Sequence, residues 1–146
     1  MHIALGCDHR GLSMKQAIIG LLDELGHAYQ DFGTYNTDSV DYPDIAKQVA
    51  GAVASGDFDH GVLICSSGIG MSIAANKVKG IRAALCCNAL AADRARRHND
   101  ANVLCLGQDI IDNDNALEIV RVYLATDFEG GRHLRRLEKI RNIEAD

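Results

Sequence analysis

The chain has 146 residues, of which 47% are hydrophobic, and its formal net charge is −5 at pH 7. This length suits one domain over residues 1–146, and the apolar content is enough for a core. The negative charge argues against general nucleic-acid binding, and no stretch approaches the ~20 apolar residues that a membrane-spanning helix needs. We therefore expect neither a nucleic-acid partner nor a membrane partner.

The chain contains five cysteines: Cys7, Cys65, Cys86, Cys87 and Cys105. Their number is odd and none shows the CxxC spacing of metal sites, so we expect reduced thiols in a cytoplasmic protein. A redox role for the two adjacent cysteines is disfavoured, because neighbouring residues of a strand point to opposite faces. The first apolar residues predict a strand rather than a signal peptide.

Apolar runs and helical patterns alternate along the chain. Short β-like runs are predicted at residues 2–6, 28–32, 61–64, 81–86 and 102–106. Helical spacing of apolar residues predicts helices at residues 12–25, 43–55, 69–77, 89–97, about 116–123 and 132–144. Gly26 and Gly80 end two of these helices, and Pro43, the only proline, suits a helix start because its missing N–H would be unpaired there.

This alternation predicts an α/β fold of three layers, α/β/α. A doubly wound five-stranded parallel sheet of Rossmann-like or flavodoxin-like type is expected, because each parallel crossover needs a helix. Ligands of such folds bind beyond the carboxyl ends of the strands, near the switch in strand order. Asp8 and His9 follow the first strand, residues 65–70 follow the third, and Asn88 follows the fourth. The residues capable of chemistry thus fall at the edge where ligands bind.

Residues 62–76 begin as a β-run, break into small residues and resume as a helix. The break places the Cys65 thiol, the Ser66 and Ser67 hydroxyls and several backbone N–H groups at a helix start, where negative charge and a thiolate are favoured. A buried cysteine that only packs is the alternative. The loop lacks the GxxxxGK[ST] pattern of nucleoside triphosphatases. We interpret it as the floor of an active site for an anionic small molecule.

Positive charge gathers at two places on this acidic chain, residues 94–98 and residues 132–141. Such clusters suit a small anion or a partner surface, and a solvated helix face is the alternative. His98 ends the helix predicted at residues 89–97, where a surface histidine is also favoured by the helix C-terminus.

Seven motifs occur along the chain in a fixed order. They are Gly6-Cys7-Asp8-His9, Asp31-Phe32-Gly33-Thr34, Asp41-Tyr42-Pro43, residues 65–77 (CSSGIGMSIAANK), Gly80-Ile81-Arg82-Ala83, Arg97-His98-Asn99-Asp100-Ala101-Asn102 and Glu129-Gly130-Gly131-Arg132-His133. On these motifs, essentially the whole chain resembles ribose-5-phosphate isomerase type B, in the wider group that also holds allose-6-phosphate and galactose-6-phosphate isomerases. The resemblance implies a homodimer, sometimes paired into a tetramer, with a C-terminal helix reaching to the partner subunit, active sites shared between subunits, and no metal or organic cofactor.

The resemblance also implies a role for each matching residue. Cys65 matches the base that moves a proton between C1 and C2 of the open sugar. The Ser67 hydroxyl and the loop residues Ser66, Gly68, Ile69 and Gly70 surround the enediolate. His98, from the partner chain, opens the furanose ring. Asp8 matches a catalytic residue that contacts sugar hydroxyls, and Tyr42 and Asn99 match residues that contact them as well. His9 binds the phosphate with Arg132 and Arg136, both arginines coming from the partner.

The chain departs from the family pattern at two places. Ser66 and Ser67 stand where the family loop usually reads Gly-Thr, and glycine allows backbone angles that serine avoids. Gln108 and Asp109 stand where many relatives carry arginine, and a carboxylate facing a phosphate would weaken binding. Ribose 5-phosphate and ribulose 5-phosphate are the expected substrates.

Two alternatives stay open. One is a six-carbon sugar phosphate such as allose 6-phosphate. The other is a non-catalytic, flavodoxin-like phosphate-binding module, which the joint presence of Cys65, Ser67 and His98 disfavours. The galactose-6-phosphate enzymes split the essential residues between two different subunits, whereas this chain carries both Cys65 and His98.

Overall fold

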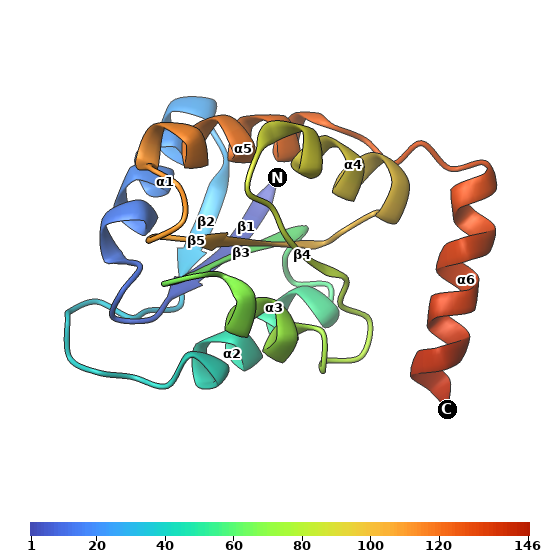
Figure 1. The fold of residues 1–146 in the computed structure, drawn as a ribbon, viewed down its shortest axis with the longest axis horizontal. Helices are drawn as coiled ribbons and strands as arrows, with labels where there is room; N and C mark the ends of the chain where they lie inside the picture. Colours follow the sequence, from blue (N-terminus) through green and yellow to red (C-terminus); the bar gives the residue numbers. More distant parts are fainter.

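The computed structural model describes residues 1–146, in which five strands alternate with helices (Figure 1). The strands are β1 (His2–Cys7), β2 (Ala28–Asp31), β3 (His60–Cys65), β4 (Ala83–Leu85) and β5 (Val103–Gly107). The helices are α1 (Leu12–Leu25), α2 (Tyr42–Ala54), α3 (Ile69–Ala75), α4 (Ala89–Asn99), α5 (Asn113–Ala125) and α6 (Arg132–Ala145). All strand pairs are parallel, so the predicted doubly wound α/β fold is confirmed.

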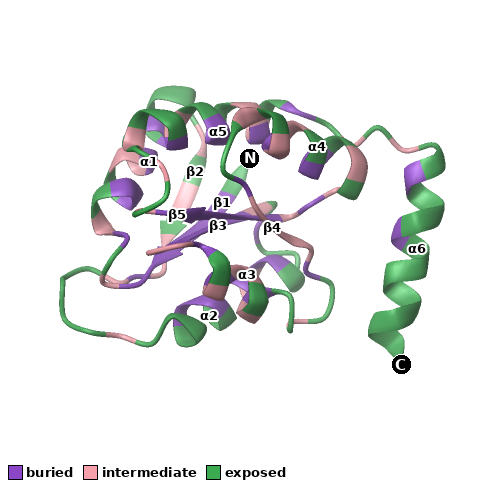
Figure 2. Cartoon of the chain, viewed as in Figure 1, coloured by how far each residue is buried: buried purple, intermediate pink, exposed green.

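Two apolar layers cover the sheet, one on each face. Ile3 and Leu5 of β1 point to the layer that contains the buried residues of α1, α4 and α5, whereas Ala4 points to the layer formed with α2 and α3. Successive residues of a strand face opposite sides, so strands buried on both faces are apolar throughout. Figure 2 shows the central strands buried between the two helical layers. The three-layer prediction is therefore confirmed.

The strand order is β2-β1-β3-β5-β4. The chain builds the sheet outward in one direction from β1 and in the other from β3, so the switch point lies between these two strands. β5 inserts between β3 and β4, which leaves β4 at the edge with only one neighbour. This position explains why the run predicted at residues 81–86 forms only a three-residue, half-buried strand.

Local capping residues fix several helix ends. Gly26 ends α1 in the left-handed conformation, with φ of 76°, and Pro43 lies in the first turn of α2, as predicted. Asn88, which the sequence placed at the ligand-binding edge, caps α4 by accepting a hydrogen bond from the Ala91 N–H at 2.8 Å. α4 continues to Asn99, so His98 lies within its last turn.

The last helix, α6, stands apart from the three layers (Figure 1). Only His133 and Leu137 of this helix are buried, and near its end the Glu144 carboxylate accepts a hydrogen bond from the Gly80 N–H at 2.8 Å. A groove of about 480 Å³ separates α6 from the β4 edge, with Ile140 and Ile143 on the helix side. None of the helices combines the length and the apolar character needed to cross a membrane.

His60, at the start of β3, makes stability dependent on pH. Burial, followed by the charge of Arg96, lowers the pKa of His60 from 6.5 to about 4, and its Nδ1 lies 3.1 Å from the Tyr123 hydroxyl. As the pH falls, His60 therefore becomes protonated near pH 6.5 in the unfolded chain, but only near pH 4 in the folded chain. Stability is lost as the pH falls through this window, by about 2–3 kcal/mol.

Urea unfolding of the native protein and of His60→Gln, measured between about pH 7 and pH 4.5, checks this expectation. The native protein should lose more unfolding free energy than the variant over that range, because glutamine does not titrate. Equal losses would show that His60 is not the group responsible.

Candidate functional site

The carboxyl ends of β1 and β3, the two strands at the switch point, bring together one group of predicted site residues. Cys65 is the last residue of β3, and Asp8 and His9 directly follow β1. The Asp8 N–H donates to the Ile64 carbonyl at 3.1 Å, which fixes the two strand ends against each other. Tyr42 starts α2 and reaches the same edge, where its ring lies beside Gly70.

The Cys65 thiol is held at the start of the central loop. Its side chain is buried, and its Sγ accepts a hydrogen bond from the Gly68 N–H at 3.1 Å. Gly68 has φ of 77°, and a Cβ there would lie 2.9 Å from the Leu106 backbone carbonyl, so glycine is required on both grounds. The hydrogen bond stabilises negative charge on the sulfur.

The other buried thiols are Cys7, Cys86 and Cys105, and burial raises the pKa of each of them. Burial raises the pKa of Cys7 and of Cys86 to about 11 each, so both stay protonated at neutral pH. All five cysteines are free. Cys65 thus differs from Cys7 and Cys86 in accepting a hydrogen bond from a backbone N–H.

The loop after Cys65 offers several hydrogen-bond donors. Ser67 Oγ accepts from the Ile69 N–H at 3.2 Å, which leaves the hydroxyl hydrogen free to donate. The N–H groups of Gly70 and Met71, in the first turn of α3, have no acceptor within the chain. An oxyanion bound beside Cys65 would meet these donors without rearrangement of the loop.

Ser66 does not strain this loop. Asp100 is the only residue other than glycine with a positive φ, so Ser66 keeps ordinary backbone angles and the loop does not demand glycine there. Instead, its carbonyl accepts a hydrogen bond from the Asp109 N–H at 2.9 Å. Gly107 allows this close approach, because a Cβ at that position would lie 2.6 Å from the Ser67 backbone.

Asp8 and His9 are oriented by backbone groups. The buried Asp8 carboxylate accepts from the Arg10 N–H at 3.0 Å. His9 Nδ1 accepts from the Val40 N–H at 3.2 Å, which assigns the proton of a neutral ring to Nε2. His9 therefore presents an N–H donor at Nε2, a group suited to a phosphate oxygen.

The Tyr42 ring leaves no room for a side chain at Gly70. A Cβ at Gly70 would lie 2.6 Å from the ring, so Gly70→Ala should push Tyr42 away from the loop and raise KM severalfold. Gly51→Ala in α2 is the matched control, because a Cβ there meets no atom within 4 Å. Steady-state kinetics of both variants, with circular dichroism to verify folding, tests this. A KM for Gly70→Ala equal to that of Gly51→Ala would contradict the steric role.

An ion pair that the sequence analysis did not identify spans the loops beside this group. Arg10 Nη2 lies 3.0 Å from Asp109 Oδ2, and both side chains are about half exposed, at 57% and 52%. The Asp109 carboxylate is therefore paired with a guanidinium. The charge pattern along the chain gave no sign of the pair, because its members lie 99 residues apart.

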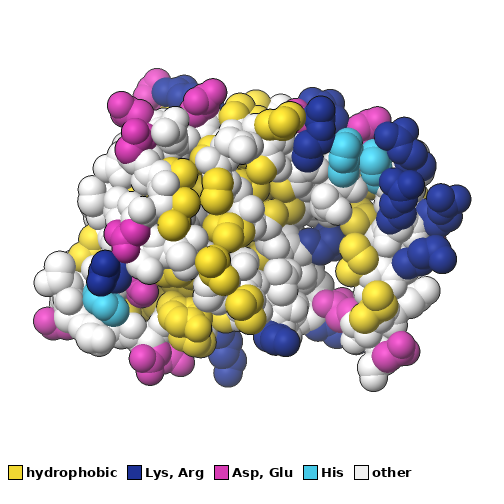
Figure 3. Space-filling view, viewed as in Figure 1, with side chains coloured by type: hydrophobic (Ala, Val, Ile, Leu, Met, Phe, Trp, Pro, Cys, Tyr) yellow, Lys and Arg dark blue, Asp and Glu magenta, His cyan; other side chains and the backbone are white.

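The remaining predicted site residues lie at the opposite edge of the sheet. α4 runs antiparallel to the strands, so its last residues, His98 and Asn99, lie beside the amino ends of the strands. Arg132 and Arg136 belong to α6, which packs against α4 and hydrogen-bonds through Glu144 to the Gly80 N–H. Figure 3 shows Lys, Arg and His side chains gathered over this region. One chain thus does not bring His98, Asn99 or the two arginines to Cys65.

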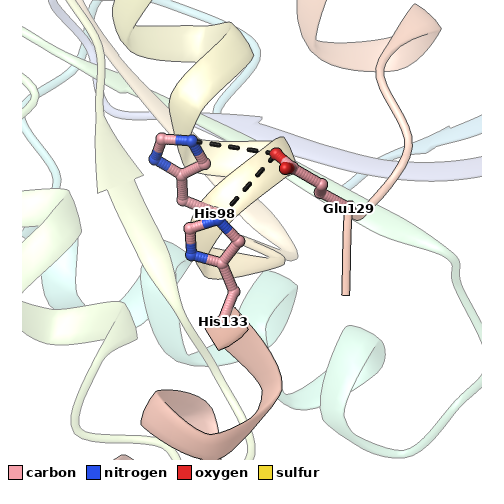
Figure 4. A group of neighbouring side chains, drawn as sticks. All are labelled: His98, Glu129 and His133. Atoms are coloured by element: carbon pink, nitrogen blue, oxygen red, sulfur yellow. Dashed lines mark ion pairs between the residues drawn. The ribbon is translucent and has the colours of Figure 1, made fainter. Parts of the chain in front are cut away.

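His98 has two neighbours that the sequence analysis did not select as site residues (Figure 4). Glu129 Oε2 lies 3.9 Å from His98 Nε2 and 3.8 Å from His133 Nε2. The two imidazole rings are stacked, with centroids 4.3 Å apart. Burial, followed by the charges of His98 and Arg132, lowers the pKa of His133. The motif at residues 129–133 contained both neighbours, but only the fold brings them to His98.

Comparison with known proteins gives a consistent result. A family model described as Ribose/Galactose Isomerase matches residues 3–140. Ribose-5-phosphate isomerase B of Escherichia coli (strain K12) is 47% identical over 142 residues, covering 97% of this chain and 95% of that protein. The structure of Clostridium thermocellum ribose-5-phosphate isomerase B superposes with a TM-score of 0.98 at 50% identity, covering 99% of this chain and 98% of that one.

A further solved structure contains a ligand. Ribose-5-phosphate isomerase B of Mycoplasma genitalium with bound ribulose-5-phosphate superposes with a TM-score of 0.95 at 41% identity, covering 99% of this chain and 97% of that one. The family model and these full-length similarities show that the chain belongs to the Ribose/Galactose Isomerase family and is an isomerase.

Proposed function

We propose that this protein interconverts ribose 5-phosphate and ribulose 5-phosphate through an enediolate. One observation carries the proposal: the Cys65 thiol, hydrogen-bonded to the Gly68 N–H, lies on a loop that also offers free donors at Ser67, Gly70 and Met71. A base next to unpaired donors is what proton transfer beside a carbonyl requires.

The proposed reaction moves one proton between neighbouring carbons. The Cys65 thiolate removes the proton from C2 of the open aldose, and the electron pair passes through the C1–C2 bond onto the carbonyl oxygen. The Ser67 hydroxyl and the loop N–H groups donate to this oxyanion. Return of the proton from Cys65 to C1, together with transfer of the hydroxyl proton from O2 to O1, completes the ketose with no net gain or loss of electrons. Asp8 and Tyr42 orient the sugar hydroxyls from the same edge.

The proposed site is complete only in a homodimer. His98, Asn99, Arg132 and Arg136 lie at the edge of the sheet opposite to Cys65, so they serve the Cys65 of a partner subunit. The exposed position of α6 and the groove beside it support this arrangement, since the helix has few contacts with its own chain. His9 and the two arginines hold the phosphate, because guanidinium groups match its oxygens. His98 opens the furanose ring.

The roles of His98 and Cys65 separate in a deuterium experiment. Ribulose 5-phosphate cannot close a furanose ring, because its C5 oxygen carries the phosphate. In D₂O, His98→Asn should still exchange the C1 proton of ribulose 5-phosphate, while its net interconversion with ribose 5-phosphate falls by about 10²-fold or more. NMR follows both rates. A parallel loss of exchange and net turnover would refute a separate ring-opening role.

The sugar is tested by direct comparison. The solved relative with bound ribulose-5-phosphate supports a five-carbon substrate. Purified protein is incubated with ribose 5-phosphate and with allose 6-phosphate, and kcat/KM is measured for each. A larger kcat/KM for ribose 5-phosphate is expected. Preference for allose 6-phosphate would establish the six-carbon alternative, and turnover of neither would support the non-catalytic one.

A further inference from the structure

Three segments that are distant in the sequence converge on one small cluster. His98 comes from the last turn of α4, Glu129 from the loop before α6, and His133 from the first turn of α6 (Figure 4). One potential ligand atom of each residue lies within 4.8 Å of those of the other two. Hydrogen bonds from the Glu129 N–H to the Arg97 carbonyl, at 3.0 Å, and from the His133 N–H to the Gly130 carbonyl, at 3.2 Å, fix the backbone around it.

The cluster contains an unpaired buried polar atom. His133 is 4% exposed, and its Nε2 has no hydrogen-bond partner. The nearest carboxylate oxygen, Glu129 Oε2, is 3.8 Å away, which is beyond hydrogen-bond distance. Buried ring nitrogens normally have a partner, so a group that binds between these side chains would complete the cluster.

Two imidazoles and one carboxylate are the donors of a three-ligand zinc site that keeps a fourth position open. Zn²⁺ binds such donors at about 2.0–2.2 Å, which places neighbouring donors of a tetrahedral site roughly 3.3–3.5 Å apart. Glu129 Oε2 is 3.9 Å from His98 Nε2 and 3.8 Å from His133 Nε2, so short side-chain movements bring the donors into range.

The side chains that must move have room to do so. The planes of the two stacked rings differ by 15°, so one ring has to turn before both Nε2 lone pairs can meet at one ion. The side chains of His98 and Glu129 are 35% and 44% exposed, respectively, whereas His133 is held in place by burial. His98 and Glu129 therefore adjust around a fixed His133.

We propose that His98, Glu129 and His133 form a binding site for Zn²⁺ or a similar divalent transition metal, and that the bound ion inhibits the enzyme. The inhibition rests on the proposed function, because an ion on His98 Nε2 occupies the lone pair needed for ring opening. The charges of Arg132 and Arg136 act on His133, and Arg97 acts on Glu129. These cations oppose metal binding, so we expect micromolar rather than nanomolar affinity.

Metal binding is measured directly on the full-length protein. Zn²⁺ competition with a chromogenic chelator should show one site per chain. Glu129→Gln and His133→Gln should each lower the Zn²⁺ affinity of this site at least about tenfold. His27→Gln is the matched control, because His27 lies outside the cluster. The Zn²⁺ affinity of this variant should equal that of the native protein. Glu129→Gln replaces a partly exposed side chain, so it keeps the test valid if His133→Gln fails to fold.

Thiols are the competing ligands, and Co²⁺ distinguishes them. Cobalt held by the cluster gives visible ligand-field bands without the near-ultraviolet charge-transfer band of a cobalt–thiolate bond, and Cys65→Ser and Cys87→Ser should leave these bands unchanged. Absence of binding, binding that persists in Glu129→Gln, or a thiolate band lost in a cysteine variant would overturn the metal site.

The inhibition has a separate readout. Zn²⁺ should slow net interconversion of the sugar phosphates far more than deuterium exchange at C1 of ribulose 5-phosphate, and Glu129→Gln should need at least about tenfold more Zn²⁺ for the same effect. Binding at the cluster without this selective inhibition would leave the site intact and overturn the inhibitory role. If the metal-free protein showed neither net interconversion nor deuterium exchange at C1, the proposed function would instead be refuted.

Discussion

Cys65→Ala should abolish isomerisation while leaving the fold intact. Alanine removes the sulfur that accepts the Gly68 N–H, and Cys7, the other thiol at a strand end, instead donates to the Thr34 carbonyl. Loss of the base should lower kcat by about 10³-fold or more. The measurement is steady-state turnover of ribose 5-phosphate, together with C1 deuterium exchange of ribulose 5-phosphate, which should be lost as well.

Cys87→Ala is the matched control for this prediction. Cys87 is exposed and lies outside the central loop, so its removal should leave turnover near that of the native protein. Iodoacetamide should inactivate the Cys87→Ala variant, and substrate should protect it. A folded Cys65→Ala protein that keeps near-native turnover would eliminate Cys65 as the base.

Mixing two inactive variants should restore activity if the sites are shared. In a heterodimer of Cys65→Ala and Arg136→Ala, one site carries both lesions and the other carries none. Random exchange of equal amounts should therefore restore roughly a quarter of the native activity. The assay uses substrate well below the native KM, because loss of a phosphate-binding arginine mainly raises KM. Native mass spectrometry verifies the exchange.

A second mixture provides the control. Cys65 and His9 lie at the same edge of the sheet, so in a heterodimer of Cys65→Ala and His9→Ala every site keeps one lesion. This mixture should stay inactive. If the Arg136→Ala mixture also stays inactive after verified exchange, Arg136 does not act on the partner's Cys65 and the shared-site proposal fails.

The sequence predicted the elements well because their signals are local. Apolar residues at helical spacing defined α1, and the polar break after residue 64 placed Cys65 at a strand end. The edge position of β4 was not predictable in this way, because it depends on β5 entering the sheet between β3 and β4. Residues 81–86 are apolar enough for a longer strand, but with one neighbour only three of them pair.

The chemistry at the switch point also followed from local pattern together with fold class. Alternating strands and helices imply a parallel sheet, and parallel strands end at one edge, so Asp8 and Cys65 had to lie near each other. The sequence could not determine the backbone conformation of Ser66 or the ion-pair partner of Asp109. Ser66 was a concern as a replacement for glycine, yet its backbone angles are ordinary, and the Asp109 carboxylate is paired with Arg10 from a distant loop.

The sequence by itself determined the residue types at the candidate site and the family that they resemble, because both are written in contiguous motifs. Only the tertiary structure decided which of those residues lie at each edge of the sheet. The antiparallel course of α4 carries His98 to the sheet edge opposite Cys65, and α6 places His133 against His98. These distances depend on the lengths and directions of packed elements, which no single motif contains, and they make a second subunit a requirement of the proposed mechanism.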